Sequence, residues 1–256
     1  MARGAYLMSL GEVDYAEAWE LQRSLAAAVS QRAVPETVLL LEHPPTITTG
    51  RRTDPAELHV PEGADVAVVE TDRGGRSTYH GPGQLVCYPI LDLRRHGQDV
   101  RKYCRDLERA IVGTLDAFGL RGETIEGLTG VWLTPPPRKI ASIGVHISRW
   151  VTTHGYALNV DLDPAPFTEW ITACGLEDAA FTSVAAELRR PVTVDEARPH
   201  AVAAFSEAFE LGFEELPAED GAGLWPQPIH ERTQAKPVGG IRSGAAVGIE
   251  QVAAQD

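Results

Sequence analysis

The stretch RGGRSTYHGPGQ, from Arg73 to Gln84, constrains the fold of this chain more than any other feature. It places four glycines and one proline within twelve residues, a density that neither a helix interior nor a central strand tolerates. Apolar stretches typical of strands flank it on both sides, over residues 65–72 and 85–91. The sequence therefore predicts a glycine-rich connection between two strands.

This connection has the composition of a ligand-holding loop in an enzyme active site. Glycine lets the backbone pass close to a ligand and adopt conformations barred to other residues, and polar side chains stand among these glycines. The alternative is a plain hairpin turn, although a two-residue turn needs only one or two glycines. The spacing matches neither the phosphate-binding GxxxxGK[ST] loop nor a dinucleotide-binding fingerprint.

Periodicity predicts helices and a strand around this loop. Residues 13–33 are rich in helix formers and hold no Gly or Pro, whereas the apolar run over residues 37–43 is typical of a buried strand that stops at Pro44. Spacings of three and four predict a helix over residues 100–118, with one apolar stripe formed by Val100, Tyr103, Cys104, Leu107, Ile111, Leu115 and Phe118. We therefore expect Cys104 in the core.

The second half of the chain alternates strands with helices. Three apolar stretches predict an antiparallel meander of strands, over residues 128–134, 139–151 and 153–162. A short helix over residues 167–174 and a longer one over residues 194–211 follow. Beyond them periodicity is lost, so we expect one catalytic domain over residues 1–215 and a flexible tail over residues 216–256. Helices mixed with antiparallel strands indicate an α+β fold.

Charge and hydropathy narrow the classes of partner. A formal net charge of -13 argues against general nucleic-acid binding, because a polyanion would be repelled. No apolar run approaches the roughly 18 residues that a membrane span needs. The start of the chain also lacks a secretory pattern, so we expect a cytoplasmic protein. Basic residues cluster nevertheless, and if they share a face they suit an acidic protein partner: Arg51, Arg52, Arg73, Arg76, Arg94, Arg95, Arg101, Lys102 and Arg105.

Two residues of the second half have the chemistry of a nucleophile and its cationic partner. Cys174 shares an apolar stripe with its short helix, which favours a place in the core, but Gly175 indicates a helix C-terminus at which the side chain can emerge. The helix dipole there disfavours a thiolate, so a reactive Cys174 needs a nearby cation. Lys139 is the natural candidate, because it precedes a strand whose small residues Ser142 and Gly144 leave room for a ligand. A surface lysine at the mouth of a strand is the alternative.

Metal and disulfide chemistry find little support. His80, His146 and His154 are conceivable ligands, but no HExxH motif or carboxylate cluster accompanies them. The three cysteines, at positions 87, 104 and 174, are too scattered for a disulfide framework or a CxxC zinc site. We expect no metal.

Four segments together resemble a known family, in the same order along the chain. They are EHPPTITTGR (residues 42–51), RGGRSTYHGPGQLVCYPILDL (73–93), RKIASIGVHISRWVTTHGYALNV (138–160) and ACGL with the downstream TSVAAEL (182–188). They are similar to the lipoyl (octanoyl) transferase family, also called lipoate-protein ligase B, the octanoyl-[acyl-carrier-protein]:protein N-octanoyltransferases. Four ordered motifs are far more specific than one.

The resemblance implies a biotin/lipoate protein ligase-like α+β fold, with an antiparallel or mixed sheet flanked by helices. It also implies transfer of octanoate from octanoyl-acyl carrier protein to a lysine of lipoyl domains, the first step of endogenous lipoate synthesis. Acceptors of this kind are the E2 subunits of 2-oxoacid dehydrogenases and the H protein of glycine cleavage. Neither a cofactor nor ATP is implied, because the donor is already an activated thioester.

The resemblance also assigns residues. In the family a cysteine, matching Cys174, takes the acyl group as a thioester, and a lysine, matching Lys139, lowers the pKa of that cysteine and moves protons. His80 either transfers a proton or only braces the loop. The residues matching the family's acyl-binding stretches are Arg73, Gly74, Gly75, Arg76, Ser77, Thr78, Tyr79, His80, Ser142, Ile143, Gly144, Gly155, Tyr156 and Ala157.

Other functions are compatible with the same motifs. An ATP-dependent lipoate or biotin ligase activates a free acid as an adenylate and does not require Cys174. A non-catalytic protein would bind acylated carriers or lipoyl domains without turnover. An amidotransferase between lipoyl proteins would also use a cysteine. That Cys174 and Lys139 lie close in space is a prediction that the sequence makes and does not test.

Overall fold

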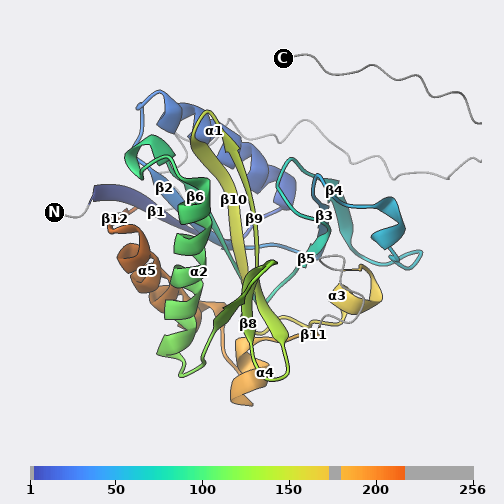
Figure 1. Cartoon of the computed structure of the whole chain (residues 1–256). Helices are drawn as coiled ribbons and strands as arrows, with labels where there is room; N and C mark the ends of the chain where they lie inside the picture. The colour runs from blue at the N-terminus through green and yellow to red at the C-terminus, as the bar shows by residue number, and fades with distance from the viewer. Residues whose placement is uncertain (1–2, 173–179, 217–256) are drawn as a thin grey trace, which may run out of the picture. The chain divides into compact units, whose positions relative to one another are not determined.

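A computed structural model describes residues 3–172 and 180–216, whose helices and strands form an α+β fold (Figure 1). Within these residues the largest element is a mixed nine-stranded sheet of order β12-β1-β2-β6-β10-β9-β8-β7, with β11 paired to β9. Its strands are β1 (Arg3–Glu12), β2 (Thr37–Glu42), β6 (Gln84–Ile90), β7 (Glu123–Ile125), β8 (Leu128–Leu133), β9 (Arg138–Ser148), β10 (Val151–Asn159), β11 (Ala180–Phe181) and β12 (Leu211–Glu215). The α+β expectation with a mixed sheet is confirmed.

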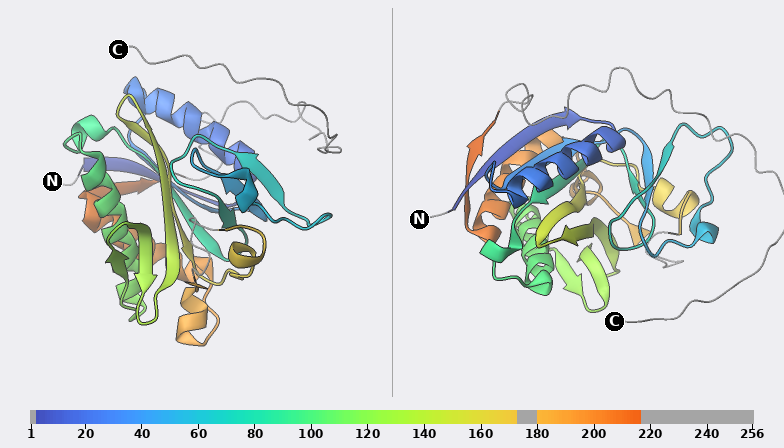
Figure 2. Two further views of the ribbon diagram at one scale, coloured as in Figure 1. Left: turned by 45° about the vertical axis from the view of Figure 1, so that its right-hand side comes forward. Right: turned by 90° about the horizontal axis from the view of Figure 1, so that it is seen from above.

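Helices cover both faces of this sheet (Figure 2). α1 (Tyr15–Ser30) packs on one face, and α2 (Val100–Ala117) and α5 (Val194–Phe209) pack on the other. β2 shows the consequence, because Val38 and Leu40 contribute to the core beneath α2 and α5, whereas Leu39 and Leu41 contribute to the core beneath α1. A strand covered on both faces needs apolar residues at every position, which explains its uninterrupted apolar run.

Local sequence fixes where α1 and α2 begin. The Asp14 side chain accepts hydrogen bonds from the Ala16 and Glu17 N–H groups in the first turn of α1, and the Asp99 side chain accepts one from the Lys102 N–H in the first turn of α2. Both helices match their predicted ranges to within a few residues. The apolar stripe of α2 faces the sheet as expected, but the prediction that Cys104 lies in the core is wrong. Cys104 is half-buried and lines a cavity, because the sheet opens beside this turn of the helix.

A small sheet of three strands lies beside the large one and contains part of the glycine-rich segment. Its strands are β3 (Thr46–Thr49), β4 (Ala67–Glu70) and β5 (Thr78–His80), in the order β4-β3-β5. Ile47 and Tyr79 pack there against Phe167 of α3 (Pro166–Glu169). The predicted connection between two strands therefore carries a short strand of its own.

The meander is confirmed, since β8, β9 and β10 pair antiparallel in sequence order. The short helix predicted over residues 167–174 ends earlier than expected. α3 stops at Glu169, and Ile171 forms an isolated antiparallel bridge to Leu58 instead. The apolar periodicity therefore reflects two different packing contacts and not one helical stripe. The short elements that complete the described chain are the 3-10 turns η1 (Pro55–Glu57) and η2 (Leu93–Arg95) and the helix α4 (Val184–Leu188).

Two further expectations concern the C-terminal tail and membrane-spanning segments. The predicted tail lies outside the described residues, apart from Leu216, whose N–H donates to the Leu7 carbonyl at 2.9 Å. No helix in the described part of the chain is long and apolar enough to cross a membrane.

Candidate active site

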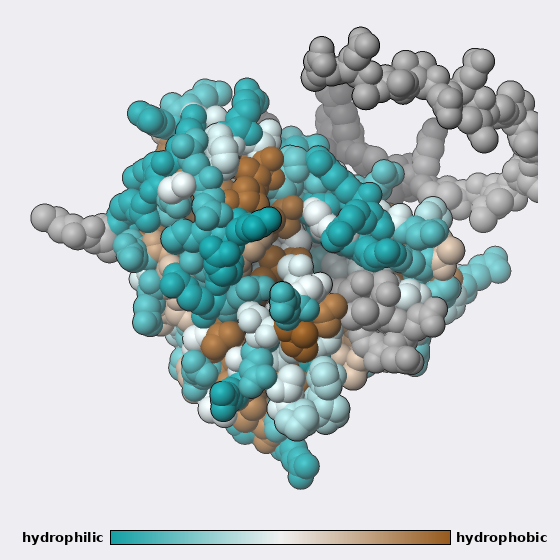
Figure 3. Space-filling model, viewed as in Figure 1, coloured by the Kyte–Doolittle hydropathy of each residue, from teal (hydrophilic) through white to brown (hydrophobic). Residues whose placement is uncertain are grey.

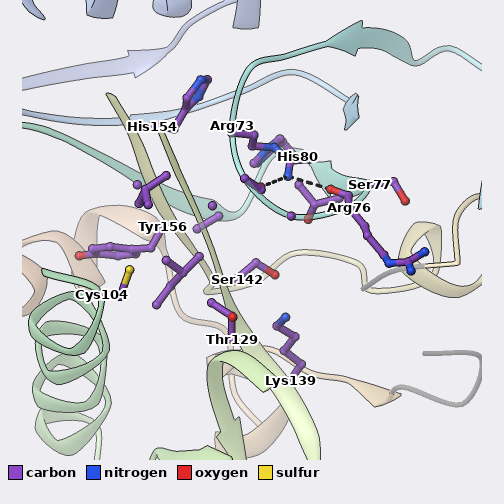
Figure 4. Close-up of a pocket in the computed structure, with 18 of the residues that line it drawn as sticks. Arg73, Arg76, Ser77, His80, Cys104, Thr129, Lys139, Ser142, His154 and Tyr156 are labelled. Carbon is purple, nitrogen blue, oxygen red and sulfur yellow. Dashed lines mark hydrogen bonds between the residues drawn. The ribbon is translucent and has the colours of Figure 1, made fainter. Parts of the chain in front are cut away.

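A cavity of about 380 Å³ opens where the glycine-rich segment meets β9 and β10. Figure 4 shows Lys139 and Thr129 at one end of its lining and His154 at the other. The predicted residues that line it are Arg73, Gly74, Gly75, Arg76, Ser77, Thr78, His80, Lys139, Ser142, Ile143, Gly144, Gly155, Tyr156 and Ala157. Three sequence segments singled out for separate reasons thus meet around one space.

Tyr79 is the predicted substrate-binding residue that does not line this cavity. Neighbouring side chains of a strand point to opposite faces, so Thr78 and His80 point toward the cavity while Tyr79 points away. Its ring makes edge-to-face contacts with Phe167 and Trp170, with centroids 5.8 and 5.9 Å away. Tyr79 therefore packs the small sheet against α3.

The Arg73 guanidinium holds the glycine-rich loop in shape from the inside. Its Nη2 donates to the Thr48 carbonyl at 2.6 Å, and its Nη1 donates to the Arg76 carbonyl at 2.8 Å. The backbone packs so tightly here that a Cβ on Gly50 would lie 2.5 Å from the Gly75 carbonyl oxygen. Gly75 itself has a φ of +90°, which favours glycine. The loop is a fixed wall of the cavity.

His80 is buried and neutral, and a chain of hydrogen bonds sets its orientation. Its Nδ1 donates to Gln84 Oε1 at 2.7 Å, since the Gln84 amide nitrogen already donates to Asn159 Oδ1 at 3.0 Å. Its Nε2 faces the Thr48 hydroxyl at 3.5 Å. Burial, reinforced by the neighbouring His43, lowers the pKa of His80 well below its ordinary value.

The same chain of hydrogen bonds reaches the strand of Lys139. Asn159 Nδ2 donates to the Thr182 carbonyl at 3.0 Å, and the Thr182 N–H donates to the Lys139 carbonyl at 3.0 Å. Gln84 and Asn159 are almost fully buried, so these bonds are protected from water. The glycine-rich loop and β9 are therefore held in a fixed mutual position.

Lys139 is 3% exposed and lies between an aromatic ring and a glycine. Its Nζ sits over the Trp132 ring, 5.3 Å from the centroid. A Cβ on Gly130 would lie 2.8 Å from Lys139 Cε, so only glycine leaves room for the lysine side chain. The sequence alternative of a surface lysine is thus wrong, and Lys139 belongs to the cavity lining.

Cys174 lies within residues 173–179, which are outside the described part of the chain, and the nearest described residues are Thr172 and Ala180. On one side, the Thr172 N–H donates to the Glu57 carbonyl at 2.8 Å. On the other side, Phe181 of β11 pairs with Lys139 of β9. Glu57 forms an ion pair with Arg76, which lines the cavity. The described residues before and after the predicted nucleophile, Thr172 and Phe181, therefore bind residues that line the cavity or contact its lining.

Comparison with known proteins identifies the family. A family model described as the lipoyl protein ligase A/B catalytic domain matches residues 14–206. The chain belongs to this family. The octanoyltransferase of Chloroflexus aggregans is 46% identical over 208 residues, which cover 79% of this chain and 93% of that protein. The octanoyltransferase of Mycobacterium tuberculosis is 50% identical over 203 residues, with 78% and 85% covered. The resemblance seen in the sequence is confirmed.

A solved structure supports the fold of this lipoyl protein ligase A/B domain. The bipartite lipoate protein ligase of Thermoplasma acidophilum superposes with a TM-score of 0.68 over 87% of this chain and 90% of that one. Its sequence identity is 17%, so the likeness concerns the fold alone. The expected lipoate protein ligase-like fold is confirmed.

Tyr15, Tyr88 and His154 also line the cavity, although none of them was predicted as a substrate-binding residue. His154 Nε2 donates to Asp72 Oδ1 at 2.8 Å, and its Nδ1 faces the Tyr15 hydroxyl at 3.3 Å. The hydrogen bond from His154 lowers the pKa of Asp72, and burial raises the pKa of Tyr15 to about 12. Tyr15 gives no sequence signal, because an aromatic residue in an amphipathic helix normally packs in a core.

The histidines considered as metal ligands have other partners. His146 Nε2 lies 3.6 Å from Asp72 Oδ2, so His146 and His154 share one carboxylate, whereas His80 donates to Gln84. Among the residues described here, no group of three or more His, Cys, Asp or Glu side chains is arranged to hold a metal ion.

The basic clusters of the sequence have separate surroundings in the structure. Arg52 and Arg76 line the cavity together with the buried Arg73. On η2, Arg94 pairs with Asp92 at 2.7 Å, and on α2 Lys102 pairs with Asp106 at 2.5 Å. Arg52 and Arg73 therefore bring positive charge to the cavity, whereas Arg76 is paired there with Glu57.

Proposed function

We propose that this chain transfers an octanoyl group from octanoyl-acyl carrier protein, through a thioester on Cys174, to a lysine of a lipoyl domain. Its membership of the family and its octanoyltransferase relatives make it an acyltransferase. The observation that carries the mechanism is the position of Lys139, buried in the cavity lining and paired with the strand that follows the Cys174 segment.

Chain connectivity supports a meeting of Cys174 with Lys139. Cys174 follows Thr172 by two residues, a span of at most roughly 7 Å between Cα atoms. Thr172 is bound to Glu57, and Glu57 is paired with Arg76 of the cavity lining. This connectivity supports the proposal that Cys174 acts at the wall of the cavity.

The first half-reaction needs a thiolate and a proton donor. In our proposal the Lys139 ammonium stabilises the Cys174 thiolate, whose sulfur attacks the thioester carbonyl carbon of the donor. The bond from that carbon to the carrier sulfur breaks, and the departing carrier thiolate takes a proton from Lys139. The two thioesters are of similar energy, so proximity supplies much of the rate and no ATP is consumed.

The second half-reaction restores the pair. The neutral amine of the acceptor lysine attacks the carbonyl carbon of the octanoyl-cysteine, and the bond to Cys174 sulfur breaks. The excess proton of the amine passes to the now neutral Lys139, which regenerates the ammonium beside the Cys174 thiolate. The products are free carrier and an octanoyl amide, so atoms and charges balance without a cofactor.

The partners follow from this chemistry and remain part of the proposal. The donor is octanoyl-acyl carrier protein, and the acceptors are lipoyl domains of 2-oxoacid dehydrogenase E2 subunits and the glycine cleavage H protein. The acidic carrier would meet positive charge at Arg52 of the cavity lining, against a chain whose net charge is -13.

Mass spectrometry tests the thioester directly. The chain is incubated with octanoyl-acyl carrier protein without ATP, and intact mass is recorded for the native protein, Cys174→Ser and the control Cys104→Ser. We expect a hydroxylamine-labile octanoyl adduct on the native chain and on Cys104→Ser, and none that hydroxylamine removes on Cys174→Ser. An absolute requirement for ATP, or an identical adduct on Cys174→Ser, would falsify the proposal.

Alkylation of the cysteine tests the role of Lys139. We expect Lys139→Ala to move the pH profile of Cys174 alkylation by iodoacetamide to higher pH, because the thiolate loses its cation. The control Lys102→Ala removes a surface charge on α2 and leaves the profile in place. Coincident profiles for Lys139→Ala and the native chain would refute this role.

A further inference from the structure

The cavity occupies a split between two neighbouring strands. The antiparallel pairing of β8 with β9 ends at Val131 and Ala141, although both strands continue. In continued register Thr129 would pair with Ile143, but the pairing of β8 with β9 stops before this point, while β7 stays paired to the other edge of β8. Gly130 has a φ of +115° where the pairing stops, a conformation that favours glycine. Thr129 and Ile143 both line the cavity.

The split exposes backbone groups of β9 to the cavity. The Val145 carbonyl accepts a hydrogen bond from the Gly74 N–H at 2.9 Å, so the main chain of Val145 points toward the split. In an antiparallel ladder, alternate residues direct their N–H and C=O to the same side. Ile143 therefore presents both groups to the split as well. Apart from bonds between paired strands, no backbone hydrogen bond among the described residues involves the Ile143 N–H or C=O.

A second polar group lies in the same wall. The Trp132 indole N–H has no hydrogen-bond partner within the described part of the chain, although the side chain is 2% exposed. Apolar residues also contribute to the cavity lining, among them Leu128, Val145 and the half-buried Cys104. Figure 3 shows apolar residues exposed in the middle of this face, over β8, β9 and β10. The split suits a ligand that is slender, partly apolar and able to form amide hydrogen bonds.

We propose that the β8–β9 split binds the pantetheine-type arm of the acyl donor, extended along β9 with its secondary amides paired to the Ile143 main chain. This inference rests on the proposed function, because it gives a binding site to the part of the thioester donor that leaves as the thiol. The acyl chain then lies between the glycine-rich loop and β10. An alkyl chain in the split would leave the Ile143 N–H and C=O buried without partners, which is unfavourable.

The dimensions favour such an arm over an added peptide strand. The unpaired part of the β9 edge is short and is centred on Ile143. On one side of it Ala141 is paired with β8, and on the other side the Val145 carbonyl accepts a hydrogen bond from Gly74. Strand addition by a peptide needs a longer edge and pockets for alternate side chains. A cavity of about 380 Å³ is in the range of small-molecule sites.

A series of donors that differ only in the arm tests this assignment. Octanoyl-pantetheine carries two amides, octanoyl-N-acetylcysteamine one, and S-ethyl octanethioate none. We measure kcat/KM for acylation of the native chain with each. We expect about a three- to tenfold increase for each amide that pairs with the protein, the net effect of one hydrogen bond. Equal kcat/KM values for all three donors would overturn the inference but leave the proposed function intact. If none of the three donors acylates the chain, the result counts against the proposed function.

A bulky residue in the split makes the test site-specific. Thr129→Phe narrows the split, and we expect it to bring the ratio of kcat/KM for octanoyl-pantetheine over S-ethyl octanethioate close to one. The matched control Thr124→Phe, exposed on β7 and absent from the cavity lining, should keep the native ratio. Thr129→Leu serves if the phenylalanine variant does not fold. A native ratio in a folded Thr129 variant sinks the inference.

Discussion

The Lys139 ammonium lies over the Trp132 ring, 5.3 Å from its centroid, in the wall of the cavity. Residues Lys139 and Trp132 are register partners on β9 and β8, so the sheet itself brings the cation to the aromatic face. A buried cation–π contact of this kind is worth up to about 2 kcal/mol. It restricts the lysine to one side of the cavity, as the proton transfers proposed for Lys139 require.

Replacing the ring tests this contact. Trp132→Phe and Trp132→Leu both remove the indole N–H, but only the phenylalanine keeps an aromatic face beneath Lys139. We expect Trp132→Leu to have roughly tenfold lower kcat/KM for octanoyl transfer than Trp132→Phe, in line with a loss of 1–2 kcal/mol. Equal activity of the two variants, at equal thermal stability, would show that the ring does not hold the lysine.

A methyl group at Gly130 should displace Lys139 from the other side. The added Cβ would lie 2.4 Å from the Ala141 carbonyl oxygen and 2.8 Å from Lys139 Cε, at a φ of +115°. We expect Gly130→Ala to lower both the melting temperature and kcat/KM. Gly119→Ala is the control, because Gly119 has a φ of +72° and no heavy atom within 4 Å of its added Cβ. A drop in activity no larger than that of the control would contradict the steric role.

Sequence reasoning identified most of the cavity because its walls carry unusual residues. Dense glycine at Gly74 and Gly75 and small residues at Ser142 and Gly144 are visible in the sequence, and all of them line the cavity. The opening between β8 and β9 was not predictable, because threonine and isoleucine, at positions Thr129 and Ile143, are common in ordinary paired strands. Cys104 was assigned to the core for a related reason: periodicity identifies the face of α2 but not the gap that this face meets.

The contact between Tyr15 and His154 in the cavity lining was not predicted, because the two residues come from distant elements. Tyr15 begins α1, and it meets His154 of β10 through a contact between residues 139 positions apart. The short helix expected over residues 167–174 ends early, at Glu169, because Ile171 pairs with Leu58 in a long-range bridge that local periodicity does not contain. Tertiary pairing outweighs a weak local preference over so few residues.

His43 makes the stability of the fold dependent on pH. Burial lowers its pKa from 6.5 to about 4, and the neutral ring accepts from the Tyr88 hydroxyl at 2.8 Å. The unfolded chain takes up the proton first, so this contribution is complete above pH 6.5 and is lost as the pH falls toward 4. Between pH 7 and pH 5 the loss amounts to about 2 kcal/mol.

Urea unfolding at these two pH values measures the effect. We expect the free energy of unfolding of the native chain to be lower at pH 5 than at pH 7. For His43→Gln we expect a lower free energy of unfolding at both pH values and a much smaller difference between them. The control His59→Gln, at an exposed position, should retain the full difference. If His43→Gln shows the same loss between the two pH values as the native chain, the titration of His43 is not its cause.

We infer from its hydrogen bonds that His80 has a positioning role and does not transfer protons. Its Nδ1 proton is committed to Gln84, its Nε2 faces Thr48, and its pKa lies well below the ordinary value. A ring that stays neutral contributes no inflection to the rate between about pH 6 and pH 8. We therefore expect His80→Gln to lower kcat/KM for octanoyl transfer without changing the shape of its pH profile in that range, whereas the disappearance of a limb of the profile would make His80 the group that moves the proton.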